Sequence, residues 1–412
     1  MSTVTSGNAI RLSMGRAPTW SWLPESEIEP DCMTQIRNIS DLPCAVHVAV
    51  MPDAHTGFGM PIGTVLATSD AVVPYAVGVD IGCGMIAVKT SLPATLDRAA
   101  VREALLGIFA RVPVGQPTKR DRNAGSFQAR QDSGALREWF ASAEERGWKA
   151  DEVKQLRERA DRQTGTLGGG NHFIELQTDG ANVWLMLHTG SRAFGHAVCT
   201  RYHRLALAAC ERWHTPLPDR DLAFLPLETT EGHDYMADMA FALRFAEESR
   251  TRIEAASLEA LRAAAGPFEI LSRVDTHHNF AAAERHMGRQ VIVHRKGAVL
   301  TVDRTGRLDV TIPGSMETGS YIGKGLANAL SLNTCAHGAG RRLGRKAVRR
   351  ANEGVRIAVE MEARGLILVT PQDTDPLDEA GRAYKDIESV MARQADLVEP
   401  VVKLAPLGTV KG

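Results

Sequence analysis

The chain has 412 residues, of which 44% are hydrophobic and 24% charged, so it can bury a large core and is not intrinsically disordered. Its formal net charge of -1 excludes overall basicity as the means of binding a polyanion, so any nucleic acid would have to meet a local patch. The six cysteines show no paired spacing, no secretory signal opens the chain, and no apolar run is long enough to span a bilayer; together these predict a reduced, cytoplasmic protein.

A polar segment and two strands are expected first. Residues 1–40 are polar and broken by prolines, with two tryptophans as an aromatic anchor. The pattern AVHVAV at 45–50 predicts a buried strand, and a Gly/Pro turn leads into a second strand. Asp53 and His55 fall in this turn. They could support a functional site, or serve the turn alone, with Asp53 accepting hydrogen bonds from local amides.

A glycine-flanked pair of candidate metal ligands follows in VGVDIGCGM, residues 77–85. Asp80 and Cys83 lie three residues apart on a tight turn between apolar segments that predict strands. A carboxylate and a thiolate held in this way can converge on one cation. A buried cysteine is more often a small hydrophobic residue, but similar glycine-rich polar motifs recur along the chain, which favours the metal site.

Two further motifs place histidines beside glycine-rich turns. A charged region at 97–161 predicts helices and ends in GTLGGGNHFIE, residues 165–175, with His172 directly after three glycines. The apolar run ANVWLML then predicts a strand that ends at His188. A lone histidine in such a place is usually a satisfied polar residue. Two of them in a chain that also carries the Asp/Cys pair suggest metal ligands.

The next part of the chain mixes helices with polar loops. Two helices joined by a proline-rich loop are expected within 200–265, and the second carries an apolar stripe typical of a core. Adjacent histidines on an extended segment point to opposite sides, so at most one of His277 and His278 can face a site. The Ser/Gly/Thr loop at 313–321 is suited to hydrogen bonding a base or a phosphate.

The stretch with the most distinctive chemistry begins at His337. An imidazole stands beside Gly-Ala-Gly, where backbone N–H groups can approach an anion, and before a basic run that predicts a helix with its N-terminus facing the same spot. That basic run contains Arg341, Arg342, Arg345, Lys346, Arg349 and Arg350. A histidine beside a phosphate cradle is a candidate nucleophile. The plain alternative is a surface loop with a solvated basic helix.

The C-terminal part predicts more helix and strand, without a domain boundary. The basic helix is expected to continue to about Arg364, followed by a strand and by a helix from Tyr384. No repeat or low-complexity linker divides the chain, and the candidate ligands extend from Asp80 to His337. We therefore predict a single large domain, residues 1–412, of the α+β class, with packed mixed sheets flanked by helices.

Taken in order, the motifs closely resemble the RtcB family of RNA ligases, from about residue 45 to the end of the chain. The matching motifs are MPDAHTGFGMPIG, VGVDIGCGM, GTLGGGNHFIE, HTGSR, HHN, HRKGA, PGSM…SY, HGAGR, AYKDI and VKG. Each is short, but the ordered series is highly specific. The resemblance implies an RtcB-like fold and an enzyme of RNA repair or tRNA splicing.

The resemblance also implies a reaction. The family joins RNA 3′-phosphate or 2′,3′-cyclic phosphate ends to 5′-hydroxyl ends, using GTP and Mn²⁺. By this likeness His337 would carry GMP as a covalent intermediate before GMP passes to the RNA 3′-phosphate. An archease-type activator is an implied partner. Two metal ions are implied, one held by Asp80, Cys83 and His172, the other by Cys83, His188 and His278.

The nucleotide contacts implied by the resemblance lie in five motifs and near the C-terminus. They are Asn171, His172, Phe173, Ile174, Glu175, His278, Asn279, Pro313, Gly314, Ser315, Met316, Ser320, His337, Gly338, Ala339, Gly340, Arg341, Tyr384 and Lys411. Arg192, Arg295 and Lys296 are expected to hold phosphates near the metals.

Three positions depart from the family pattern. Glu317 stands where a small residue is more common and would put a carboxylate close to the guanylate loop. Thr189 replaces a more usual serine. Ser249 and Arg250 stand where the family has Asn-Arg, so a contact to RNA or phosphate would be altered there. None of these changes removes a predicted metal ligand or the nucleophile.

The residue types suit this chemistry. A neutral imidazole can attack the α-phosphate of GTP, and the resulting phosphoramidate is labile enough to pass GMP on. A bridging thiolate could hold two ions roughly 3.5–4 Å apart, as in other two-metal phosphoryl-transfer sites. Because Cys and His bind Zn²⁺ more tightly than Mn²⁺, manganese follows from the resemblance alone, and excess Zn²⁺ is expected to inhibit.

Two other functions stay open from the residues themselves. A two-metal phosphoesterase would use the same five ligands and would need neither GTP nor His337 nor Lys411. A nucleic-acid-binding repair factor without catalysis would keep the basic segment and bind RNA in a salt-sensitive manner.

Overall fold

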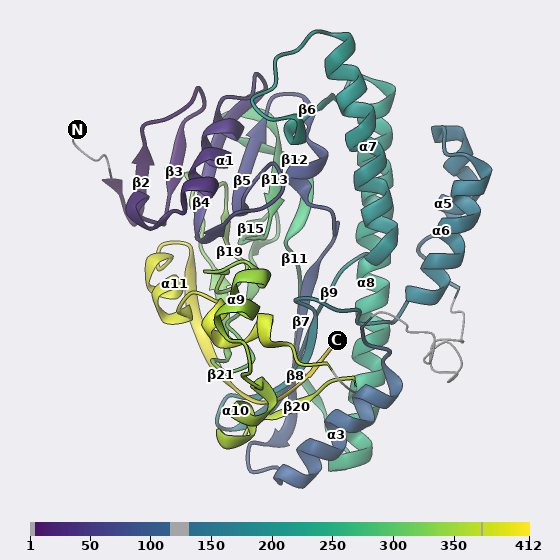
Figure 1. Cartoon of the computed structure of the whole chain (residues 1–412), viewed down its shortest axis with the longest axis vertical. Helices are drawn as coiled ribbons and strands as arrows, with labels where there is room; N and C mark the ends of the chain where they lie inside the picture. The colour runs from purple at the N-terminus through teal and green to yellow at the C-terminus, as the bar shows by residue number, and fades with distance from the viewer. Residues whose placement is uncertain (1–4, 116–131, 372–373) are drawn as a thin grey trace.

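Two large β-sheets form the centre of the molecule, and helices cover them (Figure 1). The computed structural model describes residues 5–115, 132–371 and 374–412. The predicted class, α+β with mixed sheets and flanking helices, is confirmed, because both sheets combine antiparallel neighbours with one parallel pair. Residues 116–131, part of the charged region predicted to be helical, lie outside the described residues. The boundaries of the single domain stay a prediction.

The first sheet has seven strands in the order β1-β2-β3-β4-β5-β13-β12. Their bounds are β1 (Thr5–Ser6), β2 (Ala9–Leu12), β3 (Thr19–Ser21), β4 (Ala45–His55), β5 (Ile62–Thr68), β12 (Asn279–His286) and β13 (Arg289–Lys296). The polar N-terminal segment therefore extends this sheet, since β3 pairs with β4 in parallel. Trp22, one of the predicted anchors, is buried and donates its indole N–H to Asp396 Oδ1 at 2.8 Å.

The second sheet has the order β11-β7-β9-β8-β21-β18-β17, with β20 paired to β21. Its bounds are β7 (Gly84–Pro93), β8 (Phe173–Thr178), β9 (Asn182–Thr189), β11 (Ile270–His277), β17 (Asp309–Pro313), β18 (Ser320–Gly325), β20 (Ile367–Val369) and β21 (Val398–Lys411). Side chains alternate between the faces of a strand. In β9, Leu185 and Leu187 enter one hydrophobic cluster while Trp184 and Met186 enter another, which explains the continuous apolar run.

Three short strand pairs complete the β-structure. They are β6 (Ala71–Val72) with β10 (Leu225–Pro226), β14 (Ala298–Leu300) with β19 (Thr334–Ala336), and β15 (Val302–Asp303) with β16 (Gly306–Arg307). The α-helices are α1 (Pro30–Ser40), α2 (Pro74–Val77), α3 (Arg98–Arg111), α5 (Arg137–Ser142), α6 (Ala150–Gln163), α7 (Arg192–Arg212), α8 (Thr230–Ala265), α9 (Arg345–Ala351), α10 (Ile357–Ala363) and α11 (Ile387–Arg393).

The two longest helices, α7 and α8, lie side by side along one flank of the molecule (Figure 1). The apolar stripe of α8 belongs to the core as predicted: Tyr235, Met239 and Ala246 are buried, and Leu243 packs against the same cluster as Tyr235 and Met239. Among the helices of the described ranges, none is both long and apolar enough to cross a membrane.

The basic segment after His337 differs from its prediction. Its first helix, α9, begins only at Arg345 and has seven residues. A turn at 352–354, with Gly354 at φ +82°, separates α9 from α10. The prediction of a continuous helix to about Arg364 is therefore wrong. Glycine adopts this left-handed backbone conformation without strain and therefore commonly ends a helix. Tyr384 also precedes α11 instead of starting it.

A buried carboxylate joins the helical region at 137–163 to α7 and α8. Asp238 of α8 is fully buried. It accepts hydrogen bonds from the indole N–H groups of Trp139 and Trp148, both at 2.8 Å, and from the Tyr202 hydroxyl at 2.8 Å. Arg146 Nε donates to the same carboxylate at 2.7 Å. Four donors, from α5, from α7 and from the segment between α5 and α6, therefore depend on one negative charge.

Asp238→Asn is expected to lower the free energy of unfolding by about 2–4 kcal/mol, because the amide nitrogen would face donors and leave at least one of them buried without an acceptor. Urea unfolding at pH 7 measures this change. Glu259→Gln, on an exposed part of the same helix, is the matched control and should stay within about 0.5 kcal/mol of the wild type. An Asp238→Asn protein as stable as the wild type would contradict this role.

Candidate functional site

Five strands of the second sheet begin or stop at the same end of the sheet, and several candidate site residues lie there. The first residue of β7 pairs with Thr189 at the end of β9 and with His277 at the end of β11. Phe173, the first residue of β8, pairs with His188 in β9 and with Lys411 at the end of β21. Antiparallel neighbours run in opposite directions, so the ends of some strands meet the beginnings of others. This register collects residues that are far apart in sequence.

His278 lies where the chain passes from one sheet to the other. It is the single residue between β11 of the second sheet and β12 of the first. As expected for adjacent histidines, the two rings have different surroundings. His277 contacts Arg250 Nη2 at 3.1 Å, whereas His278 faces His188, with 3.2 Å between their Nε2 atoms.

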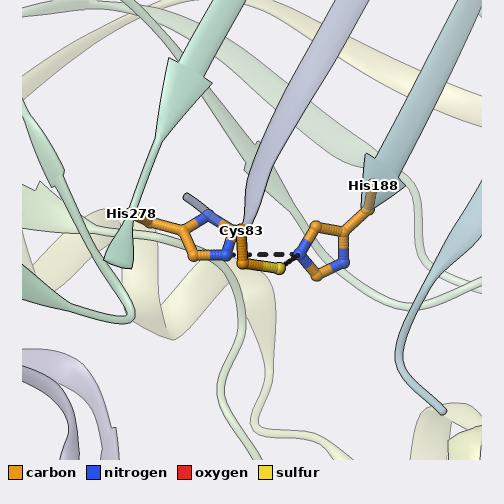
Figure 2. Close-up of side chains that lie close together, drawn as sticks. All are labelled: Cys83, His188 and His278. Carbon is orange, nitrogen blue, oxygen red and sulfur yellow. Dashed lines mark hydrogen bonds between the residues drawn. The ribbon is translucent and has the colours of Figure 1, made fainter. Parts of the chain in front are cut away.

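Figure 2 shows how Cys83, His188 and His278 point toward one another from the ends of separate strands. Cys83 Sγ lies 3.2 Å from His188 Nε2 and 3.7 Å from His172 Nε2. His172 Nε2 in turn lies 3.2 Å from Asp80 Oδ2. The ligand atoms therefore form two groups that share the thiol: Cys83, His188 and His278, and Asp80, Cys83 and His172. These are the two sets that the sequence resemblance implied.

The backbone turns the histidine Nε2 atoms toward this cluster. His172 Nδ1 donates to the Leu167 carbonyl at 3.0 Å, and His188 Nδ1 donates to the Asn171 carbonyl at 3.2 Å. With the proton on Nδ1, Nε2 of each ring is left to bind a cation. The glycine-rich turn before β8 supplies both acceptors, which accounts for the glycines in GTLGGGNHFIE.

The electrostatics of the cluster favour neutral histidines. Burial lowers the pKa of His188 and of His278 well below its usual value, and neighbouring histidines lower both further. Burial, followed by the charge of Asp80, raises the pKa of the Cys83 thiol. Burial opposes ionisation of Asp80, but the neighbouring His172 and Arg192 outweigh it and lower the pKa of that carboxyl to about 2. Neutral imidazoles beside a carboxylate are ready to bind a metal ion.

His337 lies against this cluster. Its ring centroid is 4.9 Å from that of His278. Asp53 contacts it twice: the carboxylate accepts hydrogen bonds from the His337 backbone N–H at 3.2 Å and from Nδ1 at 2.7 Å. Asp53 lies in β4 and not in the predicted turn, and its carboxylate binds His337 instead of local amides. The Nδ1 contact leaves Nε2 as the atom free to react.

Asp53→Asn is expected to slow any reaction at His337 Nε2 by about 10²-fold or more, because an amide can hold the imidazole in the wrong tautomer. Single-turnover measurements at saturating substrate isolate this step. Asp53 is fully buried, so a thermal unfolding curve must accompany them. Unchanged single-turnover rates in a folded Asp53→Asn protein would contradict the positioning role.

A cavity of about 920 Å³ opens above the cluster and His337. Its lining includes most of the predicted nucleotide contacts: Asn171, Phe173, Glu175, His278, Asn279, Pro313, Gly314, Ser315, Met316, Ser320, His337, Gly338, Ala339, Gly340, Arg341, Tyr384 and Lys411. Gly340 is required for close packing, since it has φ +71° and an added Cβ would lie 2.1 Å from the Asp53 carbonyl oxygen.

Two predicted contacts do not line the cavity. The predicted nucleotide contact at Ile174 is wrong. Side chains alternate along β8, so that of Ile174 enters the hydrophobic core beside Leu187, on the side opposite Phe173 and Glu175. His172 does not line the cavity either and belongs to the ligand cluster.

Polar groups deep in the cavity are paired with one another. Burial raises the pKa of Glu175, which accepts a hydrogen bond from Thr409 Oγ1 at 2.6 Å. Burial lowers the pKa of Lys411, whose Nζ lies 3.4 Å from Glu379 Oε2. The Tyr384 hydroxyl donates to the same Glu379 carboxylate. Glu379 is a site residue that the sequence interpretation missed, because its segment carries no motif.

The chain matches one family of known proteins over most of its length. The family described as tRNA-splicing ligase RtcB matches residues 35–412. The chain is 36% identical to an RNA-splicing ligase RtcB of Escherichia coli over 97% of this chain and 99% of that protein. It is 35% identical to a tRNA-splicing ligase RtcB of Pyrobaculum aerophilum, over 88% and 87% of the two chains. It is also 32% identical to an RNA-splicing ligase RtcB of Mycobacterium tuberculosis, over 92% and 100%.

The chain belongs to the RtcB family.

One of the three cations expected to hold phosphates in this RtcB-family chain is structural. Arg295 is fully buried; it donates to Glu284 Oε2 at 3.0 Å and to Thr334 Oγ1 at 2.9 Å, so its prediction is wrong. Arg192 does not line the cavity, and its Nη1 lies 3.1 Å from His172 Nδ1. These residues were predicted to bind phosphate because a partner from another part of the chain cannot be seen in the sequence.

Lys296 lines the cavity, but its ammonium is already engaged. Nζ donates to the carbonyls of Phe58 at 2.6 Å and Tyr75 at 3.0 Å. Burial lowers its pKa to about 8.

The departures from the RtcB pattern also find structural roles. Glu317 does not line the cavity; it accepts a hydrogen bond from the Gly381 N–H and pairs with Arg364 at 2.9 Å, so its carboxylate is not added to the cavity. Ser249 and Arg250 are both fully buried. The prediction that a contact to RNA or phosphate is altered at these positions is therefore wrong.

Arg250 instead ties together the strand ends that carry ligands. It donates to Asp275 Oδ1 at 3.0 Å and to the Gly82 carbonyl at 2.8 Å, directly before Cys83. Thr189 donates its hydroxyl to the Leu167 carbonyl at 3.1 Å, the same acceptor that orients His172.

Proposed function

We propose that this RtcB-family chain is a GTP-dependent RNA ligase that joins 3′-phosphate or 2′,3′-cyclic phosphate ends to 5′-hydroxyl ends, in RNA repair or tRNA splicing. The observation that carries the proposal is the placement of His337 against two metal-ligand groups that share Cys83, at the base of one cavity. A phosphoesterase would explain the ligand groups but not the buried carboxylate that orients His337.

Two divalent cations, proposed to be Mn²⁺, fit the donor set. The cluster offers one thiol, one carboxylate and three imidazoles within reach of one another. His278 Nδ1 is buried with no partner among the described residues, and its Nε2 lies 3.2 Å from the Nε2 atom of His188. Such a contact is unfavourable unless a proton or a cation lies between the nitrogens. When bound, the ions would neutralise charge on the phosphates.

The chain's own residues then account for the first step. His337 Nε2 attacks the α-phosphate of GTP, a phosphoramidate bond forms, and pyrophosphate leaves. Asp53 fixes the reacting tautomer through Nδ1 and stabilises positive charge on the ring as the new bond forms. The backbone at 338–340 lines the cavity beside the ring without bulky side chains, which lets a phosphate approach.

The remaining cavity residues suit a guanine nucleotide. Glu175 offers a buried carboxylate to the N–H groups of the base, and Lys411 and Tyr384 supply donors near it. A 2′,3′-cyclic phosphate must first be hydrolysed by water to a 3′-phosphate, which frees the 2′-hydroxyl. GMP then passes from His337 to the RNA 3′-phosphate, and the 5′-hydroxyl displaces GMP as the ends join. An archease-type activator and a cytoplasmic location stay predictions.

Incubation of the full chain with α-labelled GTP and Mn²⁺ tests the proposal. We expect label on the protein through an acid-labile, base-stable bond, as for a phosphoramidate, and ligation of RNA carrying 3′-phosphate and 5′-hydroxyl ends. Excess Zn²⁺ should inhibit both. Hydrolysis of a cyclic phosphate without GTP, together with no labelled protein, would favour the phosphoesterase and overturn the ligase.

A further inference from the structure

An exposed aromatic side chain stands at the rim of the cavity. Phe58 lies in the loop at 56–61 between β4 and β5, is 68% exposed and lines the same cavity as His337. A phenyl ring left in water in this way adds nothing to the core. The described part of the chain exposes few large hydrophobic residues to this extent, and such a residue beside a cavity indicates a binding surface.

The loop that carries Phe58 is held firmly although the ring is free. Gln35 binds the Gly57 backbone on both sides, donating to its carbonyl at 2.7 Å and accepting from its N–H at 3.0 Å. Lys296 Nζ donates to the Phe58 carbonyl at 2.6 Å. Gly59 has φ +63°, and a Cβ there would lie 2.9 Å from the Asp221 Cβ. The backbone is therefore fixed on three consecutive residues, so the ring is presented from a preorganised position.

A second aromatic residue of the cavity is tied to the first. Lys296 Nζ also donates to the Tyr75 carbonyl, at 3.0 Å, so one buried lysine links the backbones of Phe58 and Tyr75. The Tyr75 ring stacks on His203, with 3.8 Å between centroids and 12° between planes. One face of Tyr75 is thus covered by the protein, whereas Phe58 remains open to a ligand.

A cation without a carboxylate partner among the described residues also lines the cavity. Asp378 and Glu379 pair with Arg341, Arg345 and Arg349. The other three basic residues of the segment, Arg342, Lys346 and Arg350, are exposed and have no carboxylate partner within the part of the chain that the structure describes. Lys346 lines the cavity. An aromatic face combined with free cations is the usual means of binding single-stranded nucleic acid without strong sequence preference.

Building on the proposed ligase function, we propose that Phe58 is a stacking platform for a nucleobase close to one of the two RNA ends, while Lys346 meets the backbone phosphates. Every base has a π face, so this contact would hold broken strands of different sequence near His337. Phe58 touches RNA but takes no part in bond making, and is therefore a substrate-positioning residue.

Steady-state ligation and RNA binding by the full chain test this assignment. Phe58→Ala is expected to raise the KM for RNA about tenfold with little change in kcat, as for loss of one stacked base. Phe58→Trp should restore the wild-type KM, whereas Phe58→Leu, which keeps apolar bulk without a π face, should behave like alanine. Trp213→Ala removes another exposed aromatic that does not line the cavity and should leave the KM unchanged.

A series of RNA substrates with one abasic nucleotide at successive positions from each end identifies the stacked base. In the wild type one position should cost about tenfold in KM, and in Phe58→Ala the same abasic nucleotide should cost nothing more. A Phe58→Leu protein with wild-type KM, or an abasic penalty that persists in Phe58→Ala, overturns the stacking role. Failure of the wild type to take label from GTP would instead overturn the proposed function, so the two failures are distinguishable.

Discussion

Replacing His337 with alanine is expected to abolish labelling of the protein by α-labelled GTP, a loss of about 10³-fold or more, because removal of a nucleophile leaves only binding and electrostatic effects. The ring lies beside His278 and receives its orientation from Asp53. Among the described residues that line the cavity, His55 is the other histidine outside the ligand groups, and burial lowers its pKa to about 4. It contacts the Asp53 carbonyl through Nδ1, at 2.9 Å.

The labelled protein should be separated by denaturing gel after acid and alkaline treatment, because a phosphoramidate is lost in acid and survives base. His233→Ala, at a histidine whose side chain is 81% exposed on α8, provides the matched control and should retain full label. Thermal unfolding of both variants establishes that each is folded. Label of wild-type intensity in His337→Ala would show that another residue is the nucleophile.

Cys83→Ala is expected to remove both bound metal ions, whereas loss of any other ligand should weaken only one site. The thiol is the sole member common to the two groups. His172→Ala should therefore weaken one site and His278→Ala the other, with about half of the metal lost in each case. Without both ions, phosphate charge in the cavity would be uncompensated, and ligation should fall below detection.

Metal content per chain, measured by mass spectrometry after dialysis against Mn²⁺, checks this result without relying on activity. Cys210→Ala serves as the control, since Cys210 is equally buried but packs in the hydrophobic core next to α8. Full metal content in folded Cys83→Ala would contradict a shared thiolate. Equal losses in all five ligand variants would contradict two separable sites.

Local sequence patterns were sufficient for the elements that depend on neighbours in the chain. The apolar run before His188 forms β9, the stripe of α8 is core, and only one of the adjacent histidines 277 and 278 faces the ligand cluster. Period-2 and period-3.6 patterns describe which side of an element is buried, and glycine-rich turns mark where strands end. These features needed no knowledge of what packs against them.

Burial of charge was not predictable in the same way. Arg295 appeared in a motif as an available cation, and Arg250 stood beside Ser249, where an altered RNA or phosphate contact was expected; both are enclosed by acceptors from other parts of the chain. Three of the six basic residues after His337 form ion pairs with Asp378 and Glu379, and a turn divides the helix predicted for this segment. The energetic cost of burying a charge depends on whether a partner is present, and the partner is set by tertiary contacts.

The sequence by itself determined which residue types this protein brings to its site: one thiol, one carboxylate and histidines at strand ends, with glycines around them. Only the tertiary structure decided which atoms meet, because antiparallel register brings strand ends together irrespective of their distance along the chain. The contact between Asp53 and His337 spans 284 positions. No local pattern encodes such a pair, since its two members are selected by the packing of whole sheets.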